Sequence, residues 1–452
     1  MLRFEGPITN GRPSLPIDPR AVRLDRAGYV QEEWFVSGTA TAFAPVDPTD
    51  PAVLDGQWDT TPEAEAHFAT RLVVRRPADR ADASGHVVVE WLNVSAVEVA
   101  PEWAYLEPAI TDAAMAWIGV SAQASAIVGG SELLDTGTRM QEKRRGGIVA
   151  ANPERYGALH HPGDRFAFDI FGQIGSAFRS GAGKDVVGPD VGVVLAAGQS
   201  QSAAFLTTFV NAVQPIRHAY DGFFIHGRGS GAARLDGSPS VRWSGGGVLL
   251  RDCEVPVLVL ESETDVGPVM GFAHARQPDT PTLRIWEVAG TAHADAHLVG
   301  RNFALCPHPV NAGPLNFVAC AAFEHLIRWA GDHDSPPPTA PPIEIVPGND
   351  VALIHRDLDG IALGGLRTPS VDVPSEVLSG TSPPESGDDR MVSLFGSTTP
   401  YPRGALKSRY GSRDAYLAAF ESSLDDAIAA GYVRAADRDA YAAQARVVDF
   451  VE

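Results

Sequence analysis

Short apolar runs alternate with helix-like stretches along most of this 452-residue chain. Residues 29–45 and 69–77 are rich in β-branched and aromatic residues and are bounded by proline or glycine, which predicts two strands. Residues 86–96 and 114–123 are nearly continuous apolar runs, as expected of strands that are buried on both faces of a sheet. Later runs of the same character predict three more buried strands, at 221–227, 255–261 and 283–290.

Helical periodicity appears between these runs. The apolar residues from Phe166 to Phe178 recur every four positions, and Asp164 stands where it can cap that helix. Residues 316–331 predict a further helix. Because strands alternate with helices, we expect an α/β fold, with a mostly parallel central sheet and helices on both of its faces. Ligands of such sheets bind at the carboxyl ends of the strands.

The composition changes at the proline-rich segment 335–342, which predicts a stiff connector. We therefore expect a core at 1–334, which includes the N-terminal strands, and a C-terminal extension at 335–452 that packs back on this core. Within the extension the sequence predicts an extended stretch at 363–380, a polar loop at 381–390 and helices at 413–431 and 436–446.

The segment 191–204, VGVVLAAGQSQSAA, carries the strongest chemical signal in the chain. An apolar, β-branched run leads into Gly198, and a helix-like stretch follows Ser200 closely. A serine at the apex of a sharp strand-to-helix turn has an exposed Oγ and is a common nucleophile, and the next backbone N–H, here that of Gln201, faces the developing oxyanion. Small residues are needed two positions before and after such a serine. Gly198 meets this need, whereas Ser202 stands where glycine is usual.

Two other serines compete for the role of nucleophile. Ser121 also ends an apolar run, but no helix-like stretch follows it at once. Ser230 lies in a glycine-rich loop that lacks the strand-to-helix turn. Ser200 is therefore the predicted nucleophile.

A serine nucleophile needs a general base, and the base needs an acid that orients it. His293 follows the predicted strand 283–290, in a loop from which it could reach the serine, and is our candidate base. His226 ends another strand and is the rival base, although a place in the pocket wall suits it better. His293 and His297 also have the spacing of a helical metal pair, but no acidic or cysteine cluster completes it, so no metal or other cofactor is predicted.

The candidate acids come directly after the predicted strand 255–261. Glu263 and Asp265 are both suitable, and the sequence does not choose between them. Either one gives the chain order serine, acid, histidine. The second oxyanion donor is expected in the turn at the end of the run 86–96, near the backbone N–H of Val94.

Net charge and cysteine content restrict the classes of binding partner and the cellular compartment that we expect. The formal net charge is −20, which disfavours nucleic acid and anionic membranes as partners, because both select basic surfaces. The 3 cysteines are too few for a disulfide framework and indicate a reducing compartment. The N-terminus lacks the pattern of a signal peptide, and no apolar run approaches the ~20 residues of a membrane span. We therefore expect a cytoplasmic protein whose partner is a small molecule.

Several of these segments together resemble a known family. EWLNVSA, GQSQSA, LESETD, WEVAGTAHAD and GGLRTPSVDVP are similar to segments of the α/β-hydrolase domain family, a group of mostly uncharacterised bacterial proteins that includes a methylesterase. The resemblance spans nearly the full length, so it implies an α/β-hydrolase fold to which the C-terminal extension belongs. It also implies a serine hydrolase that cleaves a carboxylic ester, such as a methyl ester, with Ser200, His293 and an acid from ESETD as the catalytic triad. Acyl transfer, lyase chemistry and non-catalytic small-molecule binding stay as alternatives.

Overall fold

The computed structural model describes residues 2–16, 24–47, 56–130, 146–188, 190–238, 247–331, 335–348, 351–383 and 391–450. The chain divides into two compact units. The N-terminal unit comprises residues 1–257, 281–283 and 326–334, and the C-terminal unit comprises residues 258–280, 284–325 and 335–452.

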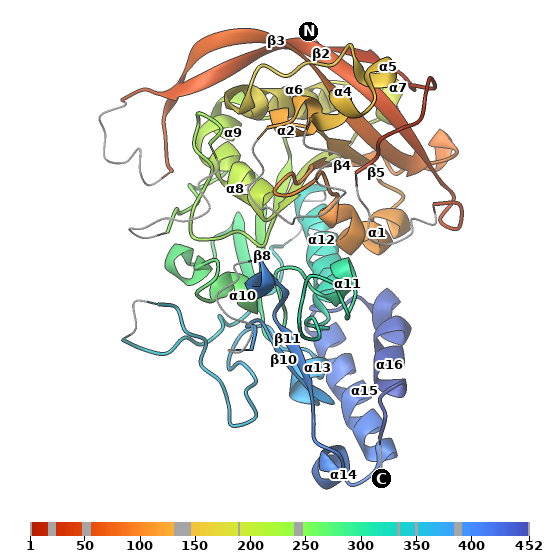
Figure 1. Ribbon diagram of the computed structural model, residues 1–452, viewed down its shortest axis with the longest axis vertical. Coiled ribbons are helices and arrows are strands. Elements are labelled where there is room, and N and C mark those ends of the chain that lie inside the picture. Colours follow the sequence, from red (N-terminus) through yellow and green to blue (C-terminus); the bar gives the residue numbers. More distant parts are fainter. Residues whose placement is uncertain are drawn as a thin grey trace. The chain divides into compact units, whose positions relative to one another are not determined.

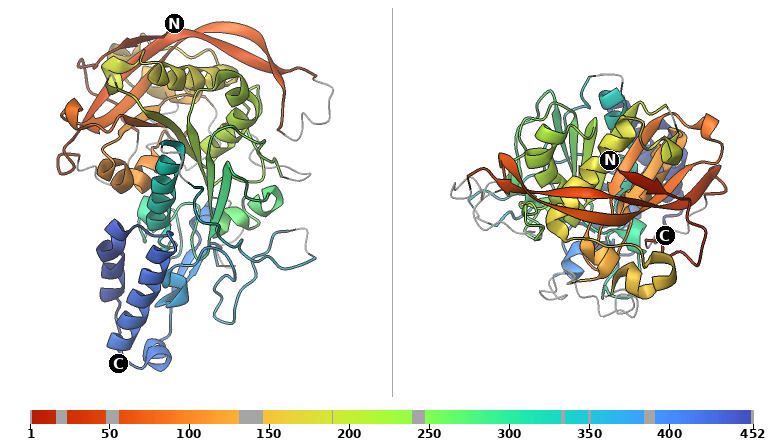
Figure 2. Two further views of the ribbon diagram at one scale, coloured as in Figure 1. Left: turned by 180° about the vertical axis from the view of Figure 1, so that it is seen from behind. Right: turned by 90° about the horizontal axis from the view of Figure 1, so that it is seen from above.

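The sheet of the N-terminal unit begins with three antiparallel strands, β1 (Arg3–Glu5), β2 (Tyr29–Pro45) and β3 (Thr60–Pro77). Figure 1 and Figure 2 show β2 and β3 as two long, curved ribbons that lie side by side. The strand predicted at 29–45 is confirmed. β3 begins earlier than predicted, because its first half is mostly exposed and polar and therefore leaves no apolar run in the sequence.

Four parallel strands continue this sheet. They are β4 (His86–Trp91), β5 (Ala116–Val120), β6 (Val193–Gln199) and β7 (Gly222–His226), and they follow β3 in the order β5-β4-β6-β7. Nearly every residue in them is buried, as the continuous apolar runs predict. Because the strands are parallel, their carboxyl ends meet at one edge of the sheet, where β6 runs into the serine turn.

Helices cover this sheet and complete the core of the N-terminal unit. α1 (Pro101–Asp112), α6 (Ala167–Arg179) and α8 (Gln201–Thr208) contact β6. The Trp91 ring at the end of β4 packs against Phe171 and Phe205, with ring centroids 4.9 and 5.0 Å away. Shorter helical segments among the described residues of this unit include α2 (Ala124–Val128), α4 (Gly147–Ala151), α5 (Pro153–Tyr156), α7 (Lys184–Val187), a π-helical turn at Phe209–Val213 and α9 (Gln214–Arg217).

The predicted capping role of Asp164 is wrong. Asp164 lies inside a 3₁₀ turn that precedes α6, and Gly163 occupies the cap position. The Asp164 carboxylate instead accepts the Ala124 N–H at 2.6 Å and the Gln123 Nε2–H at 3.1 Å, so it holds the start of α2. The local sequence assigns the Asp164 carboxylate to its own helix, but this carboxylate binds the backbone of Ala124, which is 40 residues away along the chain.

The first half of the C-terminal unit contains two buried strands and three helices. They are β8 (Val257–Ser262), α10 (Glu263–Val266), β9 (Leu283–Val288), α11 (Ala296–Val299) and α12 (Leu315–Gly331), of which Val257, Leu283 and the end of α12 from Leu326 belong to the N-terminal unit. The strands predicted at 255–261 and 283–290 and the helix predicted at 316–331 are confirmed. Throughout the described residues, no helix combines the length and apolar character needed to cross a bilayer.

The second half of this unit contains α13 (Pro369–Asp372), β10 (Glu376–Ser379), β11 (Ser397–Pro400), α14 (Ala405–Tyr410), α15 (Arg413–Ala429) and α16 (Arg438–Arg446). β10 and β11 form an antiparallel pair, and α15 and α16 lie side by side (Figure 1). Both helices contribute to an apolar cluster in which Tyr441 stacks on Phe317 of α12, with ring centroids 4.6 Å apart.

Three predictions for the extension can be compared with the structure. The two C-terminal helices are confirmed as α15 and α16. The extended stretch predicted at 363–380 is correct only in part, because α13 interrupts it. Most of the polar loop predicted at 381–390 lies outside the described residues.

Candidate active site

Ser200 stands at the apex of the turn between β6 and α8. Its backbone has φ 62° and ψ −118°, a conformation that residues with a Cβ rarely adopt. The neighbouring strand holds the turn in place, because the Ser200 N–H donates to the carbonyl oxygen of His226 at 2.9 Å. The strand therefore passes into the helix through a single strained residue, which is the local geometry of a nucleophile turn.

Gly198 and Ser202, which flank this turn, lie so close together that only one of them can carry a Cβ. A Cβ built on Gly198 would lie 3.0 Å from Cδ1 of Leu206 and 3.0 Å from Cβ of Ser202, which is closer than side chains normally approach. Ser202 is fully buried, and its Oγ has no hydrogen-bond partner within the described ranges. The Cβ of Ser202 therefore fits, in the place where glycine is usual, because Gly198 opposite has none.

The two predicted oxyanion donors both lie in the N-terminal unit. Gln201 is the first residue of α8, and Val94 lies in the loop between β4 and α1. Neither backbone N–H has an acceptor in the part of the chain that the structure describes. Both donors therefore remain available to bind a developing negative charge.

Asn93 connects the loop of Val94 to the serine turn. Its Nδ2 donates to the carbonyl oxygen of Gln199 at 3.0 Å, and its Oδ1 accepts the N–H of Ser95 at 2.9 Å. Reciprocal backbone hydrogen bonds between Asn93 and Val99, at 3.1 and 2.9 Å, close the base of the loop. The sequence places the oxyanion turn near Asn93, Val94 and Ser95 but assigns no role to the Asn93 side chain, because its partner, Gln199, is 106 residues away along the chain.

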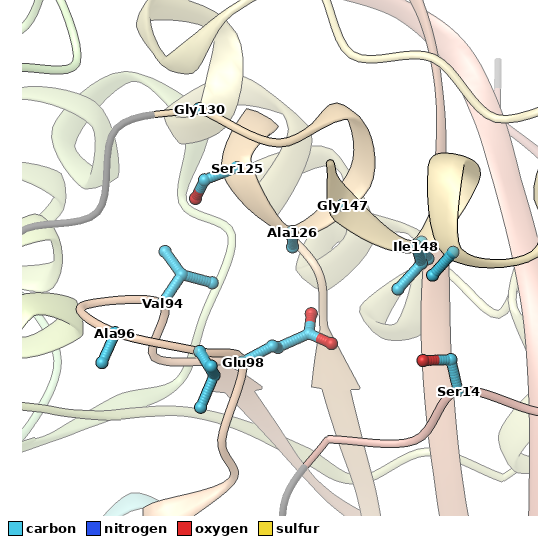
Figure 3. Close-up of a pocket in the computed structure, with 11 residues that line it drawn as sticks. Ser14, Val94, Ala96, Glu98, Ser125, Ala126, Gly130, Gly147 and Ile148 are labelled. Carbon is cyan, nitrogen blue, oxygen red and sulfur yellow. The ribbon is translucent and has the colours of Figure 1, made fainter. Parts of the chain in front are cut away.

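A small cavity of about 30 Å³ lies against the same loop (Figure 3). Loop residues line one wall and residues from the N-terminal segment, α2 and α4 line the others: Val94, Ala96 and Glu98 with Ser14, Ser125 and Ile148. A cavity of this volume holds about one water-sized group.

The rival serines have structural partners. Ser121 is fully buried, donates to Oε1 of Glu98 at 2.6 Å and accepts from Nε of Arg71 at 3.2 Å. Arg71 in turn forms a buried ion pair with Glu98. Ser230 is also buried, and its carbonyl oxygen accepts the N–H of Val248. Ser121 directly follows β5, but α2 begins only three residues later, so the strand does not pass straight into a helix there as it does at Ser200. Ser230 lies in the loop after β7.

In the C-terminal unit the candidate base is paired with one of the two candidate acids. Oδ1 of Asp265, on α10, lies 2.5 Å from Nδ1 of His293, and both side chains are buried. Because an ionised carboxylate only accepts hydrogen bonds, this contact places a proton on Nδ1 and makes Nε2 the atom of the ring that can act as a base. Oδ2 of Asp265 accepts the N–H and the Oγ–H of Ser262, at 2.8 and 2.5 Å, which fixes the carboxylate.

Glu263, the alternative acid, binds elsewhere. Its side chain is fully buried, and Oε2 accepts the N–H of Gly290 at 2.9 Å. Oε1 accepts the N–H of Gly380 at 2.9 Å and also binds Arg356. The acid that the structure places against His293 is therefore Asp265.

His226, the rival base, has a carboxylate partner of its own in the N-terminal unit. Its Nδ1 lies 3.4 Å from Oε2 of Glu102, and both residues are almost completely buried. Behind them, Glu90 accepts the Glu102 N–H at 3.0 Å and the Nε1–H of Trp117 at 2.8 Å. Burial, followed by the negative charge of Glu102, raises the pKa of Glu90 well above its usual value. The edge of the Tyr105 ring also packs on His226, which places His226 in the core against α1.

His297 lies on α11, where the Asp295 side chain caps the helix by accepting the His297 N–H at 3.0 Å. It also lines a larger cavity of about 620 Å³ in the C-terminal unit. Among the residues that the structure describes, no group of three or more His, Cys, Asp or Glu side chains is arranged to hold a metal ion.

Comparison with known proteins identifies the family to which this chain belongs. Residues 4–443 match the family model described as "Alpha/beta hydrolase domain", whereas no curated protein sequence matches significantly. Three esterase or hydrolase structures are similar at a low level. A bacterial heroin esterase has 12% identity and a TM-score of 0.33, covering 69% of this chain and 87% of its own. An esterase from Rhizomucor miehei has 11% identity and a TM-score of 0.32, covering 66% and 85%.

The third structure is a dienelactone hydrolase from Anabaena variabilis, with 12% identity and a TM-score of 0.28, covering 59% of this chain and 93% of its own. These three likenesses are too distant to carry an argument about function. The family model, in contrast, covers nearly the whole chain. The protein therefore belongs to the alpha/beta hydrolase domain family and has the α/β-hydrolase fold.

Proposed function

We propose that this protein is a serine hydrolase that cleaves a carboxylic ester of a small molecule through an acyl-enzyme on Ser200. The strained backbone of Ser200 between β6 and α8 is the observation that carries this proposal. A residue in such a conformation costs about 1–3 kcal/mol, and conformations of this kind cluster at sites of function. In α/β-hydrolases, this turn presents the nucleophile.

His293 is the proposed general base, and Asp265 is the acid that orients it. The chain order of Ser200, Asp265 and His293 is the order that this fold uses. The 2.5 Å contact between Asp265 and His293 supports the same assignment, because it leaves Nε2 as the basic atom. Nε2 takes the Ser200 proton while Oγ attacks the ester carbonyl carbon, and Asp265 stabilises the imidazolium that forms.

The negative charge of the tetrahedral intermediate is proposed to rest on two backbone N–H groups, those of Gln201 and Val94. Both lack an acceptor within the described part of the chain, and Asn93 ties the Val94 loop to the serine turn. Donors that are held in place before the reaction stabilise the developing charge without a cost of reorganisation.

Three proton transfers complete the reaction. When the intermediate collapses, the carbon–oxygen bond to the alcohol breaks, and the imidazolium of His293 returns its proton to the departing alkoxide. Water then attacks the acyl carbonyl and gives a proton to Nε2 of His293. When this second intermediate collapses, the bond from the carbon to Oγ breaks, the carboxylic acid is released, and the imidazolium of His293 returns its proton to Oγ of Ser200. Methyl esters are the substrate class that the family resemblance favours.

The test is an assay of the purified protein on a panel of aryl and methyl esters, with the free acid and any transfer product measured. We expect acid to form without an added acceptor. The Ser200→Ala variant should lose several orders of magnitude in kcat while keeping its fold. Full activity of Ser200→Ala, or product formation only with an added alcohol or amine acceptor, would overturn the proposal.

The two histidine–carboxylate pairs provide a second arm of this test. We expect His293→Gln to abolish turnover and His226→Gln to retain it, because the His226–Glu102 pair lies in the core against α1. The reverse result would assign the base to His226.

A further inference from the structure

Glu263 and Asp265 share the short helix α10, but they bind different parts of the C-terminal unit. Asp265 contacts the ring of His293, whereas Oε2 of Glu263 accepts the N–H of Gly290 at 2.9 Å. Gly290 begins the loop that carries His293. Its φ is +72°, and a Cβ there would lie 2.3 Å from Val371, so this position requires glycine and packs closely on the extension. Two neighbouring carboxylates therefore hold His293 in place. Asp265 binds its ring, and Glu263 binds the backbone at the start of its loop.

The other oxygen of Glu263 connects this arrangement to the extension. Oε1 accepts the N–H of Gly380 at 2.9 Å and also binds the guanidinium of Arg356. Thr264 Oγ1 donates to the carbonyl oxygen of Gly380 at 2.6 Å, and a Cβ on Gly380 would lie 2.6 Å from the backbone nitrogen of Thr264. The fit between α10 and residue 380 is therefore close and specific.

The extension contacts the histidine loop at further points. The N–H of Ala294, next to His293, donates to the carbonyl oxygen of Leu394 at 3.0 Å. Asn311, which precedes the extension, connects the two: its Nδ2 donates to the carbonyl oxygens of Gly290 in the loop and Ser379 in the extension, at 3.1 and 3.0 Å. The loop is thus bound on both sides of His293 by groups that come after residue 310.

We propose that Glu263 is a positioning residue for His293, and that through Glu263 the extension residues Arg356 and Gly380 set the position of the base. This inference rests on the proposed role of His293 in the reaction. Both carboxylate oxygens of Glu263 accept hydrogen bonds, so the side chain acts as a clamp between Gly290 and the pair formed by Gly380 and Arg356. Displacement of a catalytic group by about 1 Å costs about 10²-fold in rate.

Glu263→Gln tests this clamp with little change in volume. An amide has one oxygen and one N–H₂ donor, so either Gly290 or the Gly380–Arg356 pair must face a donor instead of an acceptor. We expect kcat to fall about 10²-fold with KM changed less than about twofold, because the altered contact acts on the base and not on substrate binding.

Glu287→Gln is the matched control. Glu287 is also buried, binds Arg276 through both carboxylate oxygens and accepts the N–H of Ile343 from the extension at 2.8 Å. It therefore joins the same two parts of the unit, but its carboxylate has no contact with the histidine loop among the described residues. We expect both variants to lower Tm by similar amounts and only Glu263→Gln to lower kcat.

A proton NMR spectrum of the resting enzyme provides a readout that does not depend on turnover. The Nδ1–H of a histidine in a short hydrogen bond to a carboxylate resonates far downfield, so the 2.5 Å contact with Asp265 predicts such a signal in the wild type and in Glu287→Gln. In Glu263→Gln we expect this signal to shift or disappear.

A second variant covers the case in which Glu263→Gln fails to fold. Arg356→Met removes one hydrogen-bond partner of Glu263 at a partly exposed position, and we expect it to give the same changes in kcat and in the NMR signal.

Two results would overturn the inference. One is a wild-type kcat and an unchanged downfield signal in the folded clamp variant. The other is an equal loss of kcat in the Glu287→Gln control, which would indicate general destabilisation. Failure of the proposed function is separate, because it appears as retained activity in Ser200→Ala, and the NMR signal reports on His293 whichever reaction the enzyme performs.

Discussion

Nδ1 of His293 lies 2.5 Å from Oδ1 of Asp265, and the second oxygen of this carboxylate is held by the N–H and Oγ–H of Ser262. The carboxylate therefore has a fixed orientation before any substrate arrives. Its orientation also fixes the tautomer of His293, because a carboxylate requires the proton to be on Nδ1. A histidine held in this way has Nε2 as its basic atom.

Asp265→Asn should lower kcat by about 10⁴-fold with little effect on the fold. An asparagine can turn its N–H₂ toward Nδ1 and thereby favour the wrong tautomer of His293. Asp279→Asn is a suitable control, since Asp279 also accepts a backbone N–H, that of Ile285, and pairs with Arg284 away from the histidine loop. Steady-state kinetics of both variants test this expectation, and an Asp265→Asn enzyme within tenfold of the wild type would contradict it.

Asn93→Ala should reduce kcat more than it raises KM. The substitution removes the hydrogen bond from Asn93 to the carbonyl oxygen of Gln199 and frees Ser95, so the N–H of Val94 loses its fixed position beside the serine turn. Loss of one oxyanion donor costs about 10²–10³-fold in kcat, and a misplaced donor should cost up to that amount. Ser95→Ala removes only the bond from its Oγ to Asn93 and should change kcat little. Equal kinetics in the two variants would speak against the role of this loop.

Gly198→Ala should destabilise the protein by about 1–3 kcal/mol, the usual cost of overpacking. The new Cβ would lie 3.0 Å from both Leu206 and Ser202, at the point where β6 and α8 approach each other. Gly192→Ala is the matched control in the same segment, because its nearest neighbour, His86, would be at an ordinary 3.8 Å. Urea unfolding measures both, and a Gly198→Ala variant as stable as Gly192→Ala would refute the argument.

Glu90 should make the stability of the protein depend on pH. Its raised pKa, caused first by burial and then by the charge of Glu102, means that the native state keeps a proton that the unfolded chain releases. The free energy of unfolding therefore falls as the pH rises from the usual glutamate pKa toward the raised value. His226 faces the same Glu102, so it belongs to the same cluster. Glu90→Gln cannot release a proton and should flatten this decline, as measured by urea unfolding between about pH 5 and pH 9. An unchanged slope would count against this assignment.

The sequence predicts the elements of this fold well where the signal is local. The buried strands and the helices α15 and α16 follow directly from apolar runs and helical spacing. The exposed first half of β3 gives no such signal, because its side chains face solvent on both sides of the strand. α13 is missed because Pro369 reads as a break, although proline is favoured in the first turn of a helix.

The site shows the same division between local and distant information. The turn at Ser200 is visible in the sequence, because its strand, its small residues and its helix are adjacent. The choice between Glu263 and Asp265 is not visible in the sequence. It depends on Gly290 and Gly380, which are distant along the chain and donate hydrogen bonds to the Glu263 carboxylate. The catalytic roles of these residues, and the division of the chain at residue 334, remain predictions.

The measurement that tests the central claim most directly is covalent labelling with a fluorophosphonate, followed by mass spectrometry of the labelled peptide. The account predicts one phosphonate per chain on Ser200, with labelling abolished in Ser200→Ala and strongly slowed in His293→Gln, because only an activated serine displaces the fluoride. A protein that takes up no label, or that carries it on another residue such as Ser121 or Ser230, would contradict the assignment of Ser200 as the nucleophile.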